Sequence, residues 1–308
     1  MKTTLCKVVL TYVGLFALTM NAFAHEPITF LDENNEEQVV TDYTEITGEE
    51  TVLSRGWYVV RGDVTSKVEK IEIRGNVHVI LADDSYWHAE KQLRFDGYDE
   101  YGYMYISTQS HGEKEGRMSL ACENESCFLL WGLSIYGGRI VINGSSEPYY
   151  AGMFAPNIVL KNCVVNIKSN MGIQCDNITC DGAELTVTTK YVGLMAQNTI
   201  EIKSTHRTTK LNVPNIAYGG NQNVTLPDGI VMVVGDKTYT GEVPVDAFHK
   251  NSGNKVSGDT SEALSIKGLC TQVTEDLGGW YTLNGICLPE KPTEKGVYIH
   301  NNKKFVMK

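Results

Sequence analysis

Three segments of the chain align without a gap through their first halves: Gly152-Met-Phe-Ala-Pro-Asn-Ile-Val-Leu-Lys-Asn-Cys-Val-Val-Asn-Ile, Gly172-Ile-Gln-Cys-Asp-Asn-Ile-Thr-Cys-Asp-Gly-Ala-Glu-Leu-Thr-Val, and Gly193-Leu-Met-Ala-Gln-Asn-Thr-Ile-Glu-Ile. Their spacing of about 20 residues lies in the range of stacked solenoid repeats. One coil cannot bury its apolar side by itself, whereas stacked coils share backbone hydrogen bonds and columns of like side chains. The repeat therefore predicts an all-β right-handed parallel β-helix.

The shared template is a glycine, a large apolar residue, a small residue, an asparagine and an alternating apolar run. The small residues are Ala155, Cys175 and Ala196, and the asparagines are Asn157, Asn177 and Asn198. Asparagine tolerates left-handed backbone and bonds its own main chain in turns. We expect the three asparagines to stack at a turn as a structural ladder, with a ligand-binding ladder as the alternative.

The rest of the chain carries the same short apolar runs bounded by Gly, Asn or Asp, which is typical of strands. We expect the solenoid to cover residues 53–246, after a lead-in and N-terminal cap at residues 25–52. A polar, Gly-containing stretch, 247–263, predicts a linker. Residues 264–308 predict a small β-hairpin unit, in which Cys270 and Cys287 are candidates for a disulfide.

The first 24 residues have a basic start, a short apolar core and a small-x-small end at Ala22-Phe-Ala24. This pattern predicts a secretory signal peptide, so the protein is expected to be secreted or on the cell surface. The apolar core is shorter than the roughly 20 residues that a membrane span needs. No later segment is long and apolar enough to span a membrane, so no membrane span is expected.

The charge of the chain limits the class of ligand it can bind, and its cysteine content bears on disulfides and metal sites. The chain has 27 basic and 37 acidic side chains, a net charge of -10, and no Lys/Arg cluster, so nucleic acid is not expected as a partner. Of the 8 cysteines, Cys6 lies in the predicted signal peptide, which leaves an odd number. Cys163, Cys175 and Cys180 occupy repeat positions and predict small apolar residues inside the solenoid. Neither a metal site nor a cofactor is predicted.

Residues 75–85, Gly-Asn-Val-His-Val-Ile-Leu-Ala-Asp-Asp-Ser, are followed by Ala89-Glu-Lys and a strand ending at Asp96-Gly97. This region resembles the repeat-bearing part of secreted Bacteroidetes-type right-handed parallel β-helix proteins, and the resemblance extends over roughly residues 55 to 235. It implies a carbohydrate-binding or adhesin-like role.

The end of the chain carries a second resemblance. Gly279-Trp-Tyr-Thr-Leu-Asn-Gly-Ile and the run from Pro292 to Lys308 are similar to the C-terminal segments of proteins exported by the type IX route. The unit is shorter than the usual sorting domain of that route. A plain β-hairpin cap is the alternative interpretation.

No enzyme motif is evident. Asp83-Asp84 is the only acidic pair at a strand end, where a turn role is favoured, and the signatures of serine hydrolases, zinc proteases and phosphate loops are absent. Solenoid active sites assemble across coils, so a polysaccharide-active hydrolase or lyase stays open as an alternative. A structural spacer is the third interpretation.

The candidate ligand-binding residues are aromatic and acidic side chains in or beside turns: Trp87, Tyr98, Tyr101, Tyr103, Tyr149, Tyr150, Asp96 and Asp99. Exposed rings stack on sugar rings, and carboxylates accept hydrogen bonds from hydroxyls. The alternative is that Tyr101, Tyr103 and Tyr105, at period two, simply pack on one face of a strand. The leading hypothesis is an exported, surface-associated binding protein for a polysaccharide or host glycan.

Overall fold

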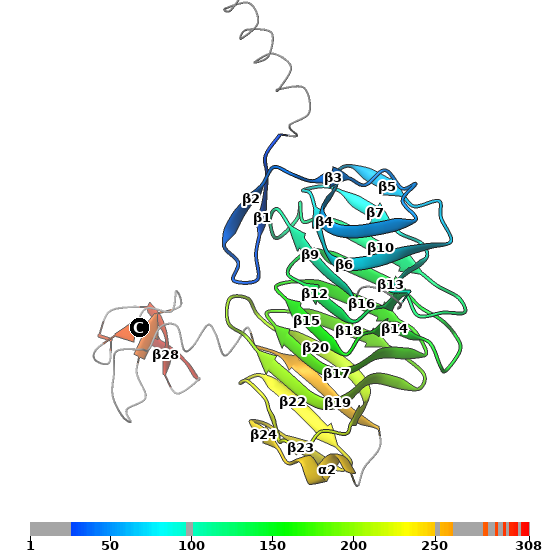
Figure 1. Ribbon diagram of the computed structural model, residues 1–308. Helices are drawn as coiled ribbons and strands as arrows, with labels where there is room; N and C mark the ends of the chain where they lie inside the picture. The colour runs from blue at the N-terminus through cyan, green and yellow to red at the C-terminus, as the bar shows by residue number, and fades with distance from the viewer. Residues whose placement is uncertain are drawn as a thin grey trace, which may run out of the picture.

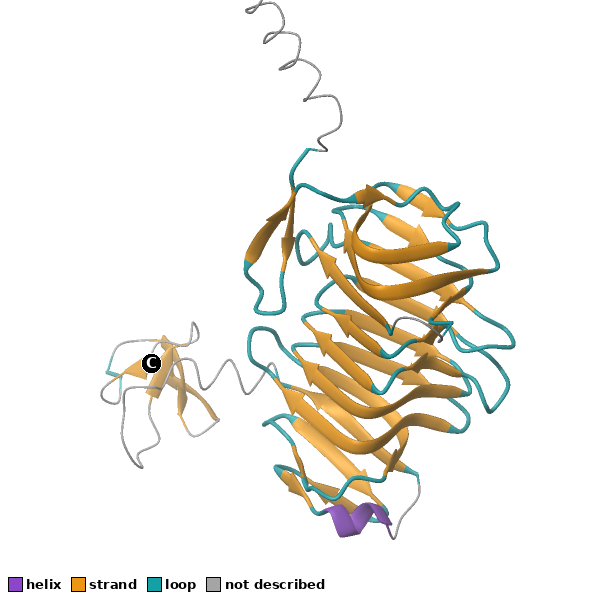
Figure 2. Cartoon of the chain, in the orientation of Figure 1, coloured by secondary structure: helices purple, strands orange, loops and turns teal. Residues whose placement is uncertain are grey.

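The computed structural model describes residues 26–96, 101–249, 253–260, 280–282, 287–288, 292–293, 296–300 and 303–307. The protein is a parallel β-solenoid of about seven turns with almost no helix, which confirms the predicted fold class (Figure 1). In the described part of the chain outside the strands, one short helix, α2 (Val245–His249), stands out at the far end from the N-terminus (Figure 2).

The turns build three parallel ladders, which we call A, B and C. Ladder A contains the first halves of β4 (Val52–Val60), β6 (Lys70–Leu81), β17 (Met171–Asp181) and β19 (Val192–Lys203), with β8 (Gln92–Arg94), β11 (Phe128–Leu129) and β14 (Ala151–Phe154). Ladder B contains the second halves of those four strands with β3 (Thr44–Glu45), β9 (Gly102–Thr108), β12 (Gly132–Ile135) and β15 (Asn157–Lys161). Ladder C contains β5 (Asp63–Thr65), β7 (Tyr86–His88), β10 (Arg117–Ala121), β13 (Arg139–Asn143), β16 (Val164–Lys168), β18 (Glu184–Thr188) and the start of β20 (Lys210–Tyr218). The bends between ladders are corners AB, BC and CA.

Columns of apolar side chains fill the interior, because every second residue of a strand points inward. One column of ladder B runs Val79, Ile106, Ile135, Leu160, Cys180 and Ile202, all in register and buried. Cys163 and Cys175 are also buried, so the prediction that the three repeat cysteines lie inside is confirmed.

The template glycines form a column in ladder A because neighbouring coils approach too closely there for a side chain. A Cβ at Gly172 would lie 2.4 Å from the carbonyl oxygen of Gly193, and one at Gly193 would lie 2.0 Å from that of Pro214. No real Cβ contact is that short. The repeat glycine is thus a packing requirement.

Two of the three template asparagines stack, and they do so at the start of strand segments instead of at a turn. Asn157 and Asn177 are register partners in ladder B, where both begin a strand segment, and neither has a positive φ. A register shift in β19 then places Thr199, and not Asn198, opposite Asn177. Left-handed residues instead recur at corner BC, at Gly62, Asp84, Gly138, Asn162 and Gly182, while corner AB has positive φ at Gly56 and Gly75.

The N-terminal end carries an antiparallel hairpin, β1 (Ile28–Leu31) and β2 (Glu37–Val40), beside ladder B (Figure 1). Trp57, His78 and Tyr105 are register partners on the outside of ladder B, with ring centroids 4.3 and 4.5 Å apart. Phe30 of the hairpin lies 4.9 Å from Trp57. The hairpin therefore covers this ring stack, and Tyr105 packs, as the alternative interpretation of the tyrosine run expected.

The other end is closed by antiparallel strands. β25 (Asn254–Asp259) pairs with β20 and with β22 (Ile230–Val234), which also pairs with β23 (Lys237–Tyr239). β21 (Val224–Thr225) pairs with β24 (Glu242–Val243). The predicted linker, residues 247–263, therefore includes ordered structure: the end of α2 and strand β25 of the main sheet. The polar composition was misleading, because Asn254 and Val256 are buried in that sheet.

A four-stranded antiparallel sheet forms near the C-terminus: β26 (Trp280–Thr282), β27 (Cys287–Leu288), β28 (Gly296–His300) and β29 (Lys303–Met307). This sheet contains the expected hairpin, β28–β29. Cys270 and the predicted signal peptide lie outside the described residues.

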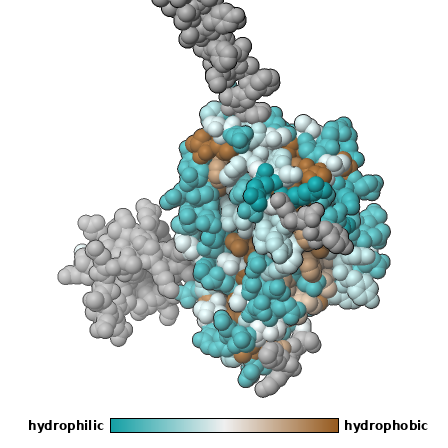
Figure 3. Space-filling view, viewed as in Figure 1, coloured by the Kyte–Doolittle hydropathy of each residue, from teal (hydrophilic) through white to brown (hydrophobic). Residues whose placement is uncertain are grey.

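The surface shown in Figure 3 is mostly polar, with small, separate apolar areas. Within the described residues, no helix has both the length and the apolar character needed to cross a membrane.

Candidate functional site

The structure separates the predicted ligand-binding residues. Trp87 is fully buried, with 0% exposure, and stacks in register between Val64 and Met118 inside ladder C. Its indole N–H donates to Ser66 Oγ at 2.9 Å. The assignment of Trp87 to an exposed surface is therefore wrong, because its strand parity turns the ring inward.

Two other tyrosines lie elsewhere on the solenoid. Tyr149 and Tyr150 precede β14 at corner CA, and Tyr149 is 82% exposed. Tyr98 and Asp99 lie outside the described residues. Only Tyr101, Tyr103 and Asp96 remain as a group, and they lie near corner AB.

Corner AB holds an aromatic groove that the sequence did not reveal as a unit. The groove has a volume of about 290 Å³ and is lined by Phe95, Leu129, Leu130, Trp131, Phe154 and Pro156. The ring centroid of Trp131 lies 5.8 Å from that of Phe95 and 4.8 Å from that of Tyr101, both in edge-to-face geometry. Tyr101 is 61% and Trp131 37% exposed, so these rings present apolar area to solvent.

Glycine at position 132 shapes the next part of this surface. A Cβ there would lie 2.5 Å from Cδ1 of Tyr103, so the Tyr103 ring lies directly over the Gly132 backbone. Tyr103, Gly132 and Asn157 are register partners on three consecutive strands. The aromatic surface thus leads into the asparagine ladder.

The asparagine ladder continues corner AB as a polar strip. Asn177 Nδ2 donates to Asn157 Oδ1 at 2.8 Å, and Thr199 Oγ1 donates to Asn177 Oδ1 at 2.9 Å. Asn157 is exposed and directly follows Pro156 of the aromatic groove. A group of apolar rings is therefore followed by a strip of amide and hydroxyl groups along one edge of the solenoid, a combination suited to sugar rings and their hydroxyls.

Asp96 contributes less to ligand binding than the sequence suggested. Its carboxylate forms ion pairs with Lys70, at 3.3 Å, and with Arg94. Burial alone would raise the pKa of Asp96, but the bonds to Lys70 and Arg94 outweigh it and lower the pKa of the carboxyl. The charge of Asp96 is thus already matched by two cations of the chain.

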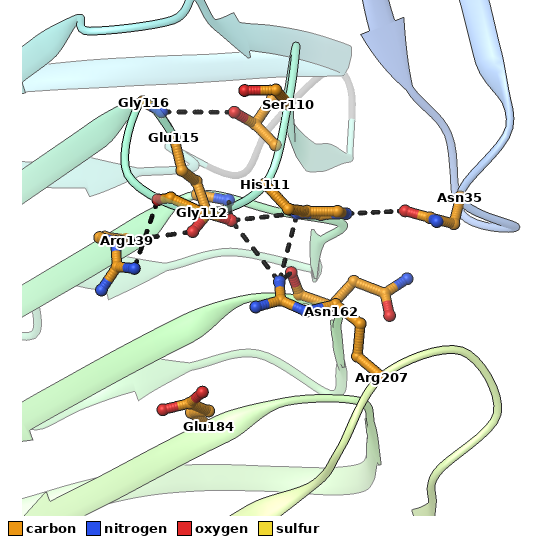
Figure 4. Close-up of polar contacts among 12 residues, drawn as sticks. Asn35, Ser110, His111, Gly112, Glu115, Gly116, Arg139, Asn162, Glu184 and Arg207 are labelled. Atoms are coloured by element: carbon orange, nitrogen blue, oxygen red, sulfur yellow. Dashed lines mark hydrogen bonds and ion pairs between the residues drawn. The ribbon is translucent and has the colours of Figure 1, made fainter. Parts of the chain in front are cut away.

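Corner BC also contains a buried polar cluster that the sequence patterns did not predict (Figure 4). We call Glu115, His111, Arg139, Asn162 and Arg207 the Glu115 cluster. The Glu115 side chain has 0% exposure, and its Oε1 accepts a hydrogen bond from the Gly138 N–H at 2.9 Å. Its Oε2 lies 3.6 Å from Nε of Arg139 and has no hydrogen-bond donor in the described structure.

His111 connects this cluster to the N-terminal hairpin. His111 Nε2 lies 2.7 Å from Oδ1 of Asn35, which follows β1, and a carbonyl oxygen can only accept, so Nε2 carries a proton. Nδ1 lies 3.2 Å from Oε1 of Glu115 and 3.2 Å from Nη1 of Arg207. Arg207 also donates to the Asn162 carbonyl oxygen and lies 3.7 Å from Glu115 Oε1. Segments far apart in the sequence meet at one buried carboxylate.

Nothing local in the sequence signals either feature. Glu115 lies in the run Gly112-Glu-Lys-Glu-Gly, which reads as a solvated turn, and Trp131 is a single aromatic residue before a glycine. Within the described residues, no group of three or more His, Cys, Asp or Glu side chains is arranged to hold a metal ion.

A scan against protein-family models, a search of curated proteins and a search of solved structures each give no match for this chain. The fold and the two corners are thus the basis for a functional assignment.

Proposed function

We propose that this protein is an exported, surface-associated glycan-binding protein whose ligand lies along corner AB. One observation supports this most directly: the partly exposed Trp131 lies in an aromatic groove that continues into the Asn157–Asn177–Thr199 strip. Rings provide the apolar contact for sugar faces, and amides provide hydrogen bonds for hydroxyls.

The test begins with a glycan-array screen of residues 25 to 308, followed by calorimetric titration of each retained glycan. Trp131→Ala is expected to weaken binding about tenfold, which corresponds to about 1.4 kcal/mol. Tyr149→Ala is the matched control, because it removes a more exposed ring at corner CA, away from the groove. Equal affinity of Trp131→Ala and the unchanged protein would refute the site.

A second assay separates binding from catalysis. Incubation of the protein with pectins or mucins should release no reducing ends. If reducing ends appear and Trp131→Ala abolishes them, the protein is a polysaccharide-active enzyme at the same surface.

The proposal that the protein is exported to the cell surface depends on the predicted signal peptide and on the resemblance of the C-terminal segment to type IX export segments. A chain that ends at Thr260 keeps β25 and the buried contacts of Thr260 with Thr209 and Ser204. This chain should melt within a few degrees of the full-length protein but fail to appear on the surface of its native host. Undiminished surface display would refute the sorting role of the tail.

A further inference from the structure

A second groove lies on a different face from the aromatic groove. It runs along the outside of ladder C, has a volume of about 480 Å³ and includes Tyr86, Arg117, Arg139 and Val164 in its lining. These four residues are register partners on four consecutive strands. With strands about 4.8 Å apart, the row extends over about 14 Å along the solenoid axis.

Two guanidinium groups face outward side by side in this row. Arg117 and Arg139 are direct register partners in a parallel pair, and both are exposed. Like charges that face each other across a ladder repel, so this arrangement costs stability unless an anion lies nearby. The chain has a net charge of -10, which makes a paired cationic position unusual on its surface.

The protein supplies a buried anion to only one of the two arginines. Arg139 Nε lies 3.6 Å from Glu115 Oε2, and Arg139 Nη2 donates to the Gly112 carbonyl oxygen at 3.4 Å. The side chain of Arg117 has no ion pair or hydrogen bond to any residue that the structure describes. Glu113 also lines the groove, but it is exposed. Arg139 is therefore held from behind by a fully buried carboxylate, while Arg117 keeps its donors for a ligand.

The remaining lining suits the body of an extended ligand. The Tyr86 ring packs at a tilt against His88, with ring centroids 3.8 Å apart, and His88 Nε2 lies 3.0 Å from Asp63 Oδ1, so a held histidine backs the tyrosine ring. Val141 and Asn166 are register partners that line the other part of the groove. A ring, an apolar side chain and an amide thus border the two cations.

We propose that this arginine groove binds a carboxylate or sulfate group carried by an extended ligand, with Arg117 as the principal contact and Arg139 as the pre-positioned second one. Guanidinium groups match both oxyanions because their parallel N–H donors meet two oxygens at once. The site is independent of the aromatic groove, so either can fail without the other.

The test uses two matched pairs of probes: oligogalacturonate against its methyl ester, and dextran sulfate against dextran. Calorimetric titration of the full chain should detect the acidic member of at least one pair and neither neutral member, and the responding pair identifies carboxylate or sulfate. Binding should weaken steeply as salt rises from about 50 mM to about 500 mM, because the contact is between exposed charges. Equal binding of acidic and neutral members would overturn the proposal.

The variants locate the contact. Arg117→Gln should weaken binding of the acidic probe about tenfold, and Arg117→Lys should restore part of the loss because it keeps the charge without the planar fork. Arg55→Gln is the control: it removes the same exposed charge from β4, outside the groove. If Arg55→Gln weakens binding as much as Arg117→Gln, only the general charge of the surface is involved and the site is refuted.

Discussion

Corners AB and BC both bend the chain from one ladder of the solenoid to the next, yet the backbone conformations and residue types at the two corners differ. At corner BC the backbone is left-handed in coil after coil, at Gly138, Asn162 and Gly182. At corner AB, residues 129–132, 154–157 and 174–177 contain no positive φ, although Gly56 and Gly75 have one in the N-terminal coils of β4 and β6. A left-handed position accepts few residue types, whereas an ordinary one accepts nearly all.

The difference explains where side-chain variety occurs. Corner AB is free to carry Trp131, Pro156 and Asn177 at successive coils, and it forms an exposed surface. Corner BC carries small or turn-forming residues at its left-handed positions and buries the carboxylate of Glu115. Backbone constraint at one corner therefore leaves the other as the more variable surface for recognition.

The largest change in stability is expected when the buried carboxylate of corner BC is removed. Glu115→Ala deletes the acceptor of the Gly138 N–H and the anion between Arg139 and Arg207, and it should destabilise the protein by about 3 kcal/mol. Glu184→Ala, which removes an exposed partner of Lys210, should cost less than about 1 kcal/mol. Denaturant unfolding measures both; a similar, small loss for each would show that the cluster is not a structural centre.

The second test addresses the backbone at corner BC. Gly182→Ala places a Cβ 2.7 Å from Asn162 Oδ1 at a residue with φ of +66°, and it should cost about 2 kcal/mol. Asn162→Gly, one coil earlier at φ of 51°, should change the free energy of unfolding by less than about 0.5 kcal/mol, because glycine adopts this conformation readily. Thermal melts compare the two, and equal losses would contradict a backbone origin.

The third test uses a thiol inside corner AB. Burial raises the pKa of Cys175 from 9.0 to about 12, so the folded protein keeps the proton over a range in which the unfolded chain loses it. The stability linked to this thiol is full below pH 9 and falls as pH rises toward 12; at pH 10 the loss is on the order of 1 to 2 kcal/mol. Cys175→Ala matches Ala155 and Ala196 of the neighbouring coils, so it should fold normally and lose less stability between pH 8 and pH 10. An unchanged alkaline slope in urea unfolding would rule out the thiol as its source.

The smallest effect is expected from the polar strip of corner AB. Asn177→Ala removes the hydrogen bonds to Asn157 and Thr199, which are exposed enough for water to replace them, so the cost should be about 1 kcal/mol. Chemical unfolding gives the value, and Asn198→Ala serves as the matched control because Asn198 has no side-chain bond in this ladder. A loss above about 3 kcal/mol, the size expected for Glu115, would remove the distinction between the corners.

Sequence alone predicted the solenoid because its repeat is local and gapless. The glycine column, the interior cysteines and the Asn157–Asn177 pair all follow from one alignment, since parallel in-register coils place equivalent residues side by side. The third asparagine was displaced because β19 contains one extra residue before Thr199, and a single-residue shift changes which side chain faces the partner.

The candidate site was predicted only in part. Tyr101, Tyr103 and Asp96 lie at corner AB, but Trp131 and Phe154 belong to later coils, and their proximity depends on the register of the ladder. Trp87 was misplaced because a three-residue strand, β7, has too few positions to reveal which side faces inward. Glu115 was missed because its partners, Arg139 and Arg207, come from corners one and four coils further along the chain.

The ladder bonds also have a mechanical consequence. They run between coils, parallel to the solenoid axis, so a pulling force on the two ends loads them in tension, and the coils detach one after another. Arg207, which follows β19, is bonded to the Asn162 carbonyl two coils back and lies beside Glu115. A force that peels the solenoid from its C-terminal end therefore meets this cross-link before it reaches the coils between, and the force–extension trace should show its first strong resistance there.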